Sequence, residues 1–151
     1  MKTFVSFVMA GAVAIAWTTP SAFAQSEAEM IASAESAAPA AVASAATIYG
    51  FDQAGGMITL REGSNGWWCM PDTPTTPGPD PMCGDANAMG WAMAWIGKTE
   101  PPAGKIGFFY MLAGGSDGSN TDPYAEGPTE GNNWITTGRH VMIMNAGDMM
   151  A

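Results

Sequence analysis

The stretch "NGWWCMPDTPTTPGPDPMCGD", residues 65–85, decides the fold. It holds both cysteines of the chain, Cys69 and Cys83, with five prolines between them and a tryptophan pair just before the first cysteine. In an oxidising compartment an even cysteine count usually means a disulfide, and the spacing matches no C-x-x-C metal unit. Closing a loop of this length contributes about 3 kcal/mol in the chain-entropy model. We therefore expect a disulfide-closed, proline-rich loop that links the elements on its two sides.

The N-terminus has the pattern of a secretory signal peptide, residues 1–24. An uncharged apolar run covers residues 4–17, and "AFA" at residues 22–24 forms the small-x-small pattern that signal peptidase cuts. The run is too short for a stable membrane anchor. We expect a periplasmic or secreted protein that starts at Gln25 and is not inserted in a membrane after cleavage.

The charge of the chain argues against two classes of partner. The formal net charge is −9, and loss of Lys2 with the signal peptide makes it −10. Nucleic acids and anionic membrane surfaces both call for basic patches, so neither is expected as a partner. The acidic residues are scattered along the chain, so the charge does not itself identify a ligand.

The mature chain divides into a lead and a domain. Residues 25–47 are rich in alanine and carry almost no large side chain to bury, which predicts a disordered linker. A single small globular domain then covers residues 48–151. Its first two apolar runs, residues 48–51 and 57–61, flank a glycine-rich turn and predict a β-hairpin.

One helix stands out after the cysteines. Asp85 is a good N-cap for a helix over residues 86–96, and Gly97 stands where a left-handed residue ends many helices. The helix is apolar nearly all round, which predicts that it is buried, within the domain or against a partner chain.

Strands follow the helix. Residues 105–113 form a continuous apolar run, which predicts a central strand covered on both faces, and residues 134–136 and 140–144 predict two more strands. The fold class we expect is α+β: a small, mostly antiparallel sheet packed on one buried helix, with the disulfide-closed proline-rich loop at its side.

Trp67 and Trp68 are the candidate binding residues. Neighbouring side chains of an extended chain point to opposite faces, so we expect one ring in the core and the other outward. An exposed tryptophan on a stiff loop can hold a sugar ring or a protein partner. The reading we prefer to an exposed ring is that both rings cover the core beside the disulfide.

Two metal sites are alternatives to a metal-free protein. The strand at 140–144 places His140, Met142 and Met144 on one face, a ligand set that suits Cu(I), although methionine also fills cores.

The second possible metal is Ca²⁺. The glycine-rich loop carries Asp117, Asn120 and Asp122, whose oxygens could bind it, but the spacing does not match an EF-hand. A solvated loop without a metal is the alternative reading.

Enzymatic chemistry has little support. The "GGSDG" at residues 114–118 matches the G-x-S-x-G nucleophile pattern around Ser116, but a loop follows it where a small hydrolase would need a helix. His140 is the only histidine, and no paired carboxylates stand out. We expect a non-enzymatic protein without a cofactor that binds a small molecule or another envelope protein.

The strings "REGSNGWWCMPDTPTTPGPDPMC", "GGSDGSNTDP" and "HVMI" resemble a family of small exported bacterial proteins of unknown function. The resemblance covers residues 48–143, and it implies no activity. Members of that family tend to have proline where this chain has Arg139. They also continue past the position of Ala151 with a further strand, so the resemblance implies that this chain is either truncated or divergent at its C-terminus.

Overall fold

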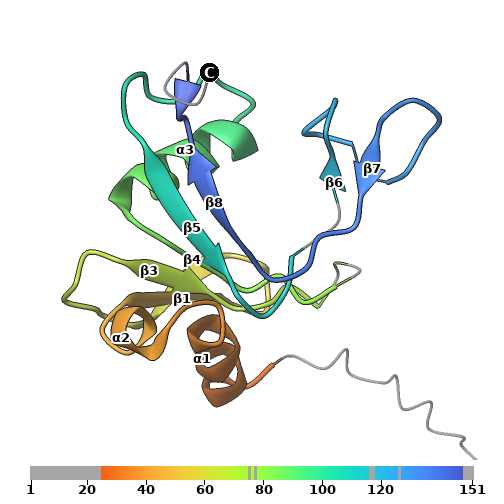
Figure 1. Cartoon of the computed structure of the whole chain (residues 1–151). Coiled ribbons are helices and arrows are strands. Elements are labelled where there is room, and N and C mark those ends of the chain that lie inside the picture. The colour runs from red at the N-terminus through yellow and green to blue at the C-terminus, as the bar shows by residue number, and fades with distance from the viewer. Residues whose placement is uncertain (1–24, 75, 77, 116–117, 126, 148–151) are drawn as a thin grey trace, which may run out of the picture.

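The computed structural model describes residues 25–74, 76, 78–115, 118–125 and 127–147, and the predicted signal peptide lies outside these ranges (Figure 1). The fold is α+β, as predicted, with a six-stranded sheet in the order β2-β1-β3-β4-β5-β8 and a separate pair, β6-β7. The strands are β1 Thr47–Phe51, β2 Met57–Arg61, β3 Trp68–Met70, β4 Met82–Gly84, β5 Gly107–Met111, β6 Gly118–Ser119, β7 Trp134–Ile135 and β8 His140–Met144. The helices are α1 Glu27–Glu35, α2 Ala40–Ala43 and α3 Ala86–Ile96.

The pairing of the strands confirms the predicted hairpin and the mostly antiparallel sheet. β1 and β2 pair antiparallel, as do β3 with β4, β4 with β5, and β5 with β8. Only the pairing of β1 with β3 is parallel among the strands of this sheet. The predicted strands at 134–136 and 140–144 are also present, as β7 and β8.

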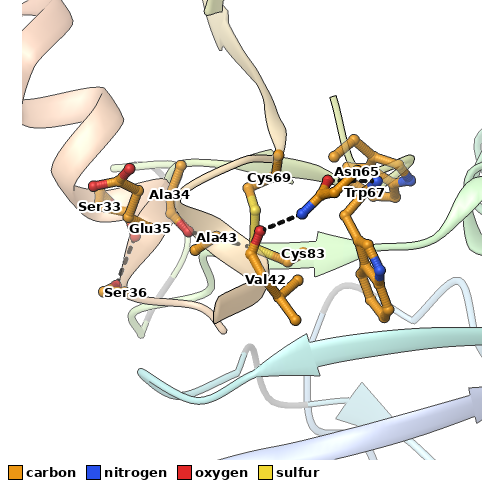
Figure 2. Close-up of a disulfide and its surroundings, with 12 residues drawn as sticks. Ser33, Ala34, Glu35, Ser36, Val42, Ala43, Asn65, Trp67, Cys69 and Cys83 are labelled. Carbon is orange, nitrogen blue, oxygen red and sulfur yellow. Dashed lines mark hydrogen bonds between the residues drawn. A yellow bond between two sulfur atoms is a disulfide. The ribbon is translucent and has the colours of Figure 1, made fainter. Parts of the chain in front are cut away.

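The disulfide holds the middle of the sheet together, as predicted. β3 and β4 are neighbours in the sheet, and their register places Cys69 opposite Cys83. The two residues form a disulfide, and both are 0% exposed. Figure 2 shows Ala34 and Ala43 of the helical layer beside the bridge. The bridge therefore fixes the strands on either side of the proline-rich loop and forms part of the core itself.

The sheet has a separate hydrophobic cluster on each face. One cluster joins the disulfide and Ile48 to alanines of the α1–α2 segment. The other joins Trp68 and Phe109 to Ala88 of α3. α1 and α2 thus lie on one face of the sheet and α3 on the other (Figure 1).

The prediction of a disordered linker over residues 25–47 is wrong. α1 begins with a capping box, in which Ser26 Oγ accepts from the amide of Glu29 and the Glu29 carboxylate accepts from the amide of Ser26. The small side chains of this segment let its backbone approach the sheet closely. Six of its residues are buried: Met30, Ala34, Ala37, Ala38, Ala43 and Ala46.

Polar contacts from the sheet hold the alanine-rich segment in place. Arg61 donates to Glu35 Oε1 at 2.6 Å and to the carbonyl of Ala43 at 2.7 Å. The amide of Leu112 donates to the carbonyl of Ala37 at 2.9 Å. Alanine composition alone indicated too little apolar surface for folding, but it gave no sign of these partners.

α3 begins as predicted, but it is not a buried helix. Asp85 caps it by accepting from the amide of Ala88 at 2.8 Å. Only Ala88 and Ala94 of the helix are buried, whereas Met93 is 54% and Ile96 is 65% exposed. The helix packs one side on the sheet, and several apolar residues on its other side remain in solvent.

The run at residues 105–113 contains β5, which is an inner strand between β4 and β8 but is not covered on both faces. β5 is next to the edge strand β8 in the sheet. Phe109 is buried on the α3 side, whereas its neighbour Phe108 is 41% exposed. The physical reason is that α1 packs on β1, β3 and β4 and leaves the β5–β8 end of that face largely open.

Candidate functional site

A pair of exposed aromatic rings forms the best candidate binding site. Trp95, on the last turn of α3, is 43% exposed, and Tyr124 is 41% exposed. Their ring centroids are 6.2 Å apart and their planes differ by only 19°. We call the surrounding hollow of about 390 Å³ the Trp95–Tyr124 site. The residues that line it are Trp95, Ile96, Lys98, Pro123, Tyr124 and Ala125.

A smaller cavity adjoins this site, and we call it the side hollow. Its volume is about 120 Å³, and it shares Trp95, Pro123 and Tyr124 with the larger one. Its remaining lining residues are Trp91, Ala94, Thr99 and Pro101. The shared residues make the two hollows one continuous surface.

The C-terminal end of α3 supplies Lys98 in an unusual backbone conformation. The predicted left-handed residue was Gly97, but Gly97 has a φ of −76° and Lys98 has a φ of 50°. The left-handed region costs a side-chain-bearing residue about 1 kcal/mol. The amide of Thr99 donates to the carbonyl of Ala94 at 2.8 Å and closes the helix end. This geometry places the Lys98 ammonium 5.0 Å from the centroid of the Tyr124 ring.

The loop that carries Tyr124 is shaped by its own side chains. Ser119 Oγ accepts from the amide of Asp122 at 2.9 Å, and Asp122 Oδ1 accepts from the amide of Tyr124 at 2.9 Å. The indole N–H of Trp95 donates to the carbonyl of Pro123 at 3.1 Å. The loop is therefore attached to the helix through the same indole that forms the site, which fixes the two rings relative to each other.

The chemistry of these residues favours binding. Two fixed aromatic faces offer apolar contact, and the ammonium of Lys98 has three N–H donors for the polar rim of a ligand. The described lining residues include no carboxyl, imidazole or thiol group. In the described ranges as a whole, no cluster of three or more His, Cys, Asp or Glu side chains is arranged to hold a metal ion.

Trp67 and Trp68 point to opposite faces of the sheet, as their adjacency predicts. Trp68 is only 5% exposed, and its indole N–H donates to the carbonyl of Asp85 at 2.8 Å, so it is a core residue. Trp67 is half-buried: it packs against the cluster around the disulfide and lies 5.4 Å from the Tyr110 ring between centroids. Both rings therefore cover core surface, the reading preferred from the sequence. A hollow of about 300 Å³ lies beside the pair, and a ligand there remains a prediction.

The candidate Cu(I) ligands share one face of β8, but two of them pack in the core. Met142 and Met144 contact the cluster of Trp68 and Phe109 beside α3. His140 Nδ1 lies 2.6 Å from the carbonyl of Gly138. A strand rises about 3.3 Å per residue, so His140 and Met144 are roughly 13 Å apart along it and only neighbouring members of the set lie close together. Cu(I) binding remains a prediction.

The candidate Ca²⁺ ligands are only partly described. Asp117 lies outside the described residues, as does Ser116 of the nucleophile-like motif. Asn120 is exposed, and its backbone N–H donates to the backbone carbonyl of Asn133 at 3.2 Å. Asp122 holds the turn at Tyr124, so its carboxylate already has a structural partner. Calcium binding likewise remains a prediction.

The proline-rich loop contains a carboxyl pair that sequence reasoning missed. Asp72 Oδ1 accepts from the amide of Asp80 at 2.8 Å, and Asp80 Oδ1 accepts from the amide of Thr73 at 3.1 Å. Burial raises the pKa of Asp72 above its usual 3.8, and the nearby charge of Asp80 adds to the increase. Each carboxylate accepts from a backbone amide at the other end of the loop, and these two hydrogen bonds hold the ends together.

Replacing Asp72 with asparagine is expected to change the pH dependence of stability. The free energy of unfolding of the variant, compared with that of the unmodified protein, should increase as the pH rises. A folded-state pKa above the unfolded value gives a stabilising term that is fully present below 3.8 and is lost as the pH rises through the folded value. Asparagine keeps an oxygen acceptor but does not ionise, so the variant does not lose stability through this residue as the pH rises. Denaturant midpoints of both proteins at about pH 3 and about pH 6 check this. A difference that stays constant between the two pH values contradicts it.

No protein family model matches the chain, and neither a curated protein nor a solved structure shows significant similarity to it. The geometry of the candidate site is therefore the only support for it, because no similar protein indicates a binding site. The signal that could have revealed it was the unbroken apolar surface of α3. That pattern predicted burial, whereas one side of the helix carries Trp95 into solvent.

Proposed function

We propose that this chain is an exported, non-enzymatic protein that binds a sugar chain at the Trp95–Tyr124 site. The observation that carries the proposal is the pair of exposed, nearly parallel rings, 19° apart in plane, which a hydrogen bond from Trp95 holds to the facing loop. A site that is already ordered loses little conformational entropy when it binds.

The chemistry of a sugar suits this surface. A pyranose ring has an apolar face of C–H groups and a rim of hydroxyls. The C–H face packs on an aromatic ring, and the hydroxyls can accept from the Lys98 ammonium. Lys98 holds a left-handed backbone conformation at a position directly after a glycine. Strain of this kind often accompanies function, so it supports a binding role for the ammonium.

The disulfide supports export, and the residues that line the two hollows support binding. The disulfide is typical of proteins that fold in oxidising compartments, which agrees with the signal-peptide pattern of residues 1–24. No described helix is long and apolar enough to cross a membrane. The residues lining the two hollows offer aromatic, aliphatic, hydroxyl and ammonium groups, a set suited to holding a ligand.

Replacing Trp95 with alanine is expected to weaken sugar binding at least tenfold, which corresponds to about 1.4 kcal/mol. The test is calorimetric titration of the disulfide-bonded protein with chitotriose and with cellotriose. Met93→Ala is the matched control, because Met93 is 54% exposed on the same helix and does not line the site. The proposal fails if neither sugar binds, or if Trp95→Ala binds as tightly as the unmodified protein.

A second variant in the same titration separates binding from stability. Lys98→Gly relieves the left-handed backbone and is expected to raise the free energy of unfolding by about 1 kcal/mol. It also removes the ammonium that lies 5.0 Å from the Tyr124 ring centroid, so sugar affinity should fall. Opposite changes in stability and affinity are the expected result. An unchanged affinity excludes Lys98 from the site.

A further inference from the structure

The side hollow has the size of a small chemical group. Its volume is about 120 Å³. One water molecule needs roughly 10–15 Å³ of such space, so the hollow has room for a group of several non-hydrogen atoms. A single hydroxyl group of a ligand would fill only a small part of the hollow and leave the rest to water. An acetamido group, with its nitrogen, carbonyl carbon, oxygen and methyl, matches it in size.

The lining of the side hollow matches an acetamido group in chemistry as well. Trp91, Ala94 and Pro101 present apolar surface that suits a methyl group and disfavours a charged one. Thr99 adds a hydroxyl whose oxygen donates to the carbonyl of Ala94 at 3.4 Å and has lone pairs left to accept an amide N–H. A small, mostly apolar space with a few polar groups is typical of a specificity pocket.

The position of the hollow connects it to the proposed sugar site. Both hollows are lined by Trp95, Pro123 and Tyr124. A sugar ring that packs on the exposed parts of Trp95 and Tyr124 therefore lies directly beside the side hollow and can direct one substituent into it. We propose that the site selects sugars whose ring carries an acetamido group, that is, N-acetylated amino sugars. This inference rests on the proposed function, because it requires a sugar at the Trp95–Tyr124 site.

Three trisaccharides with the same β-1,4 linkage test the inference. Chitotriose carries an acetamido group at C2, cellotriose carries a hydroxyl there, and the glucosamine trimer carries an ammonium. Calorimetric titration of the disulfide-bonded protein should show chitotriose binding about tenfold tighter than either of the others, the discrimination expected from a small group that fills an apolar pocket.

Two substitutions locate the preference in the side hollow. Ala94→Leu fills the space and should reduce the affinity for chitotriose to that for cellotriose. Ala94 is 8% exposed, so this variant can also disturb the helix. Thr99→Val removes only the hydroxyl, and it should reduce the preference for chitotriose without changing the affinity for cellotriose. Met93→Ala is again the control, and it should keep the full preference.

The outcomes distinguish the two proposals. Equal affinity for chitotriose and cellotriose overturns the acetamido inference and leaves the sugar-binding function intact. A preference for chitotriose that survives in both Ala94→Leu and Thr99→Val, with both proteins folded, also overturns it. If none of the three trisaccharides binds, the proposed function fails and the inference fails with it.

Discussion

Replacing both Cys69 and Cys83 with alanine is expected to lower the free energy of unfolding by about 3 kcal/mol or more. The two residues are 14 positions apart, and closing a loop of that length removes about 3 kcal/mol of chain entropy from the unfolded state. Both cysteines are 0% exposed and contact the alanine-rich helical layer, so their loss also opens space in the core. For a small domain a loss of this size is a large share of its total stability.

Urea unfolding of the variant and of the oxidised protein, followed by near-ultraviolet circular dichroism, measures this loss. Reduction of the unmodified protein is the internal control. Reduction should shift the urea midpoint of the unmodified protein towards that of the variant, whereas the midpoint of the variant should not change when reductant is added. If the variant unfolds at the same urea concentration as the oxidised protein, the bridge is not a major source of stability.

Replacing Gly107 with alanine is expected to destabilise the protein by about 3 kcal/mol or more, or to prevent folding. A Cβ at this position would lie 2.4 Å from the amide nitrogen of Ala88 and 2.7 Å from its Cα. These are backbone atoms of α3, so no side-chain rotation can relieve the overlap. The start of β5 and the first turn of α3 would have to move apart, which would open the cluster that contains Phe109 and Ala88.

Gly138→Ala is the matched control for this substitution. Nothing lies within 4 Å of the Cβ that it would add. The control carries the same change in backbone entropy and none of the steric overlap, so its denaturant midpoint should stay close to that of the unmodified protein. Equal midpoints for the two variants would show that close packing of α3 on β5 does not limit the choice of residue at 107.

The parts of the fold that the sequence predicted depend on local signals. The β1–β2 hairpin follows from two apolar runs around a glycine-rich turn, and α3 starts where Asp85 can accept from the amide of Ala88. The disulfide follows from an even cysteine count and an export pattern. The hairpin and helix signals act over a few residues, and the disulfide follows from the cysteine count and the N-terminal pattern, so none of them required knowledge of the packed structure.

The alanine-rich segment and the candidate site depend on partners that are distant in sequence. Residues 25–47 are ordered because Arg61 and Leu112 hold them against the sheet, and neither partner shows in the segment's own composition. The Trp95–Tyr124 site joins the end of α3 to a loop almost thirty residues further along the chain. An apolar pattern predicts that a helix buries some surface, but it does not say which side stays in solvent.

The sequence by itself determined the local elements: the hairpin, the start of α3, the later strands and the bridged proline-rich loop. Turns and helix caps form between residues that are close in sequence, and the disulfide follows from the cysteine count. These features can therefore be predicted from the order of the residues. Only the tertiary structure decided that the alanine-rich lead forms a layer of the domain, that one side of α3 is exposed, and that Trp95 faces Tyr124. Burial is a property of the surfaces that surround a residue, and those surfaces come from segments that the chain brings together only when it folds.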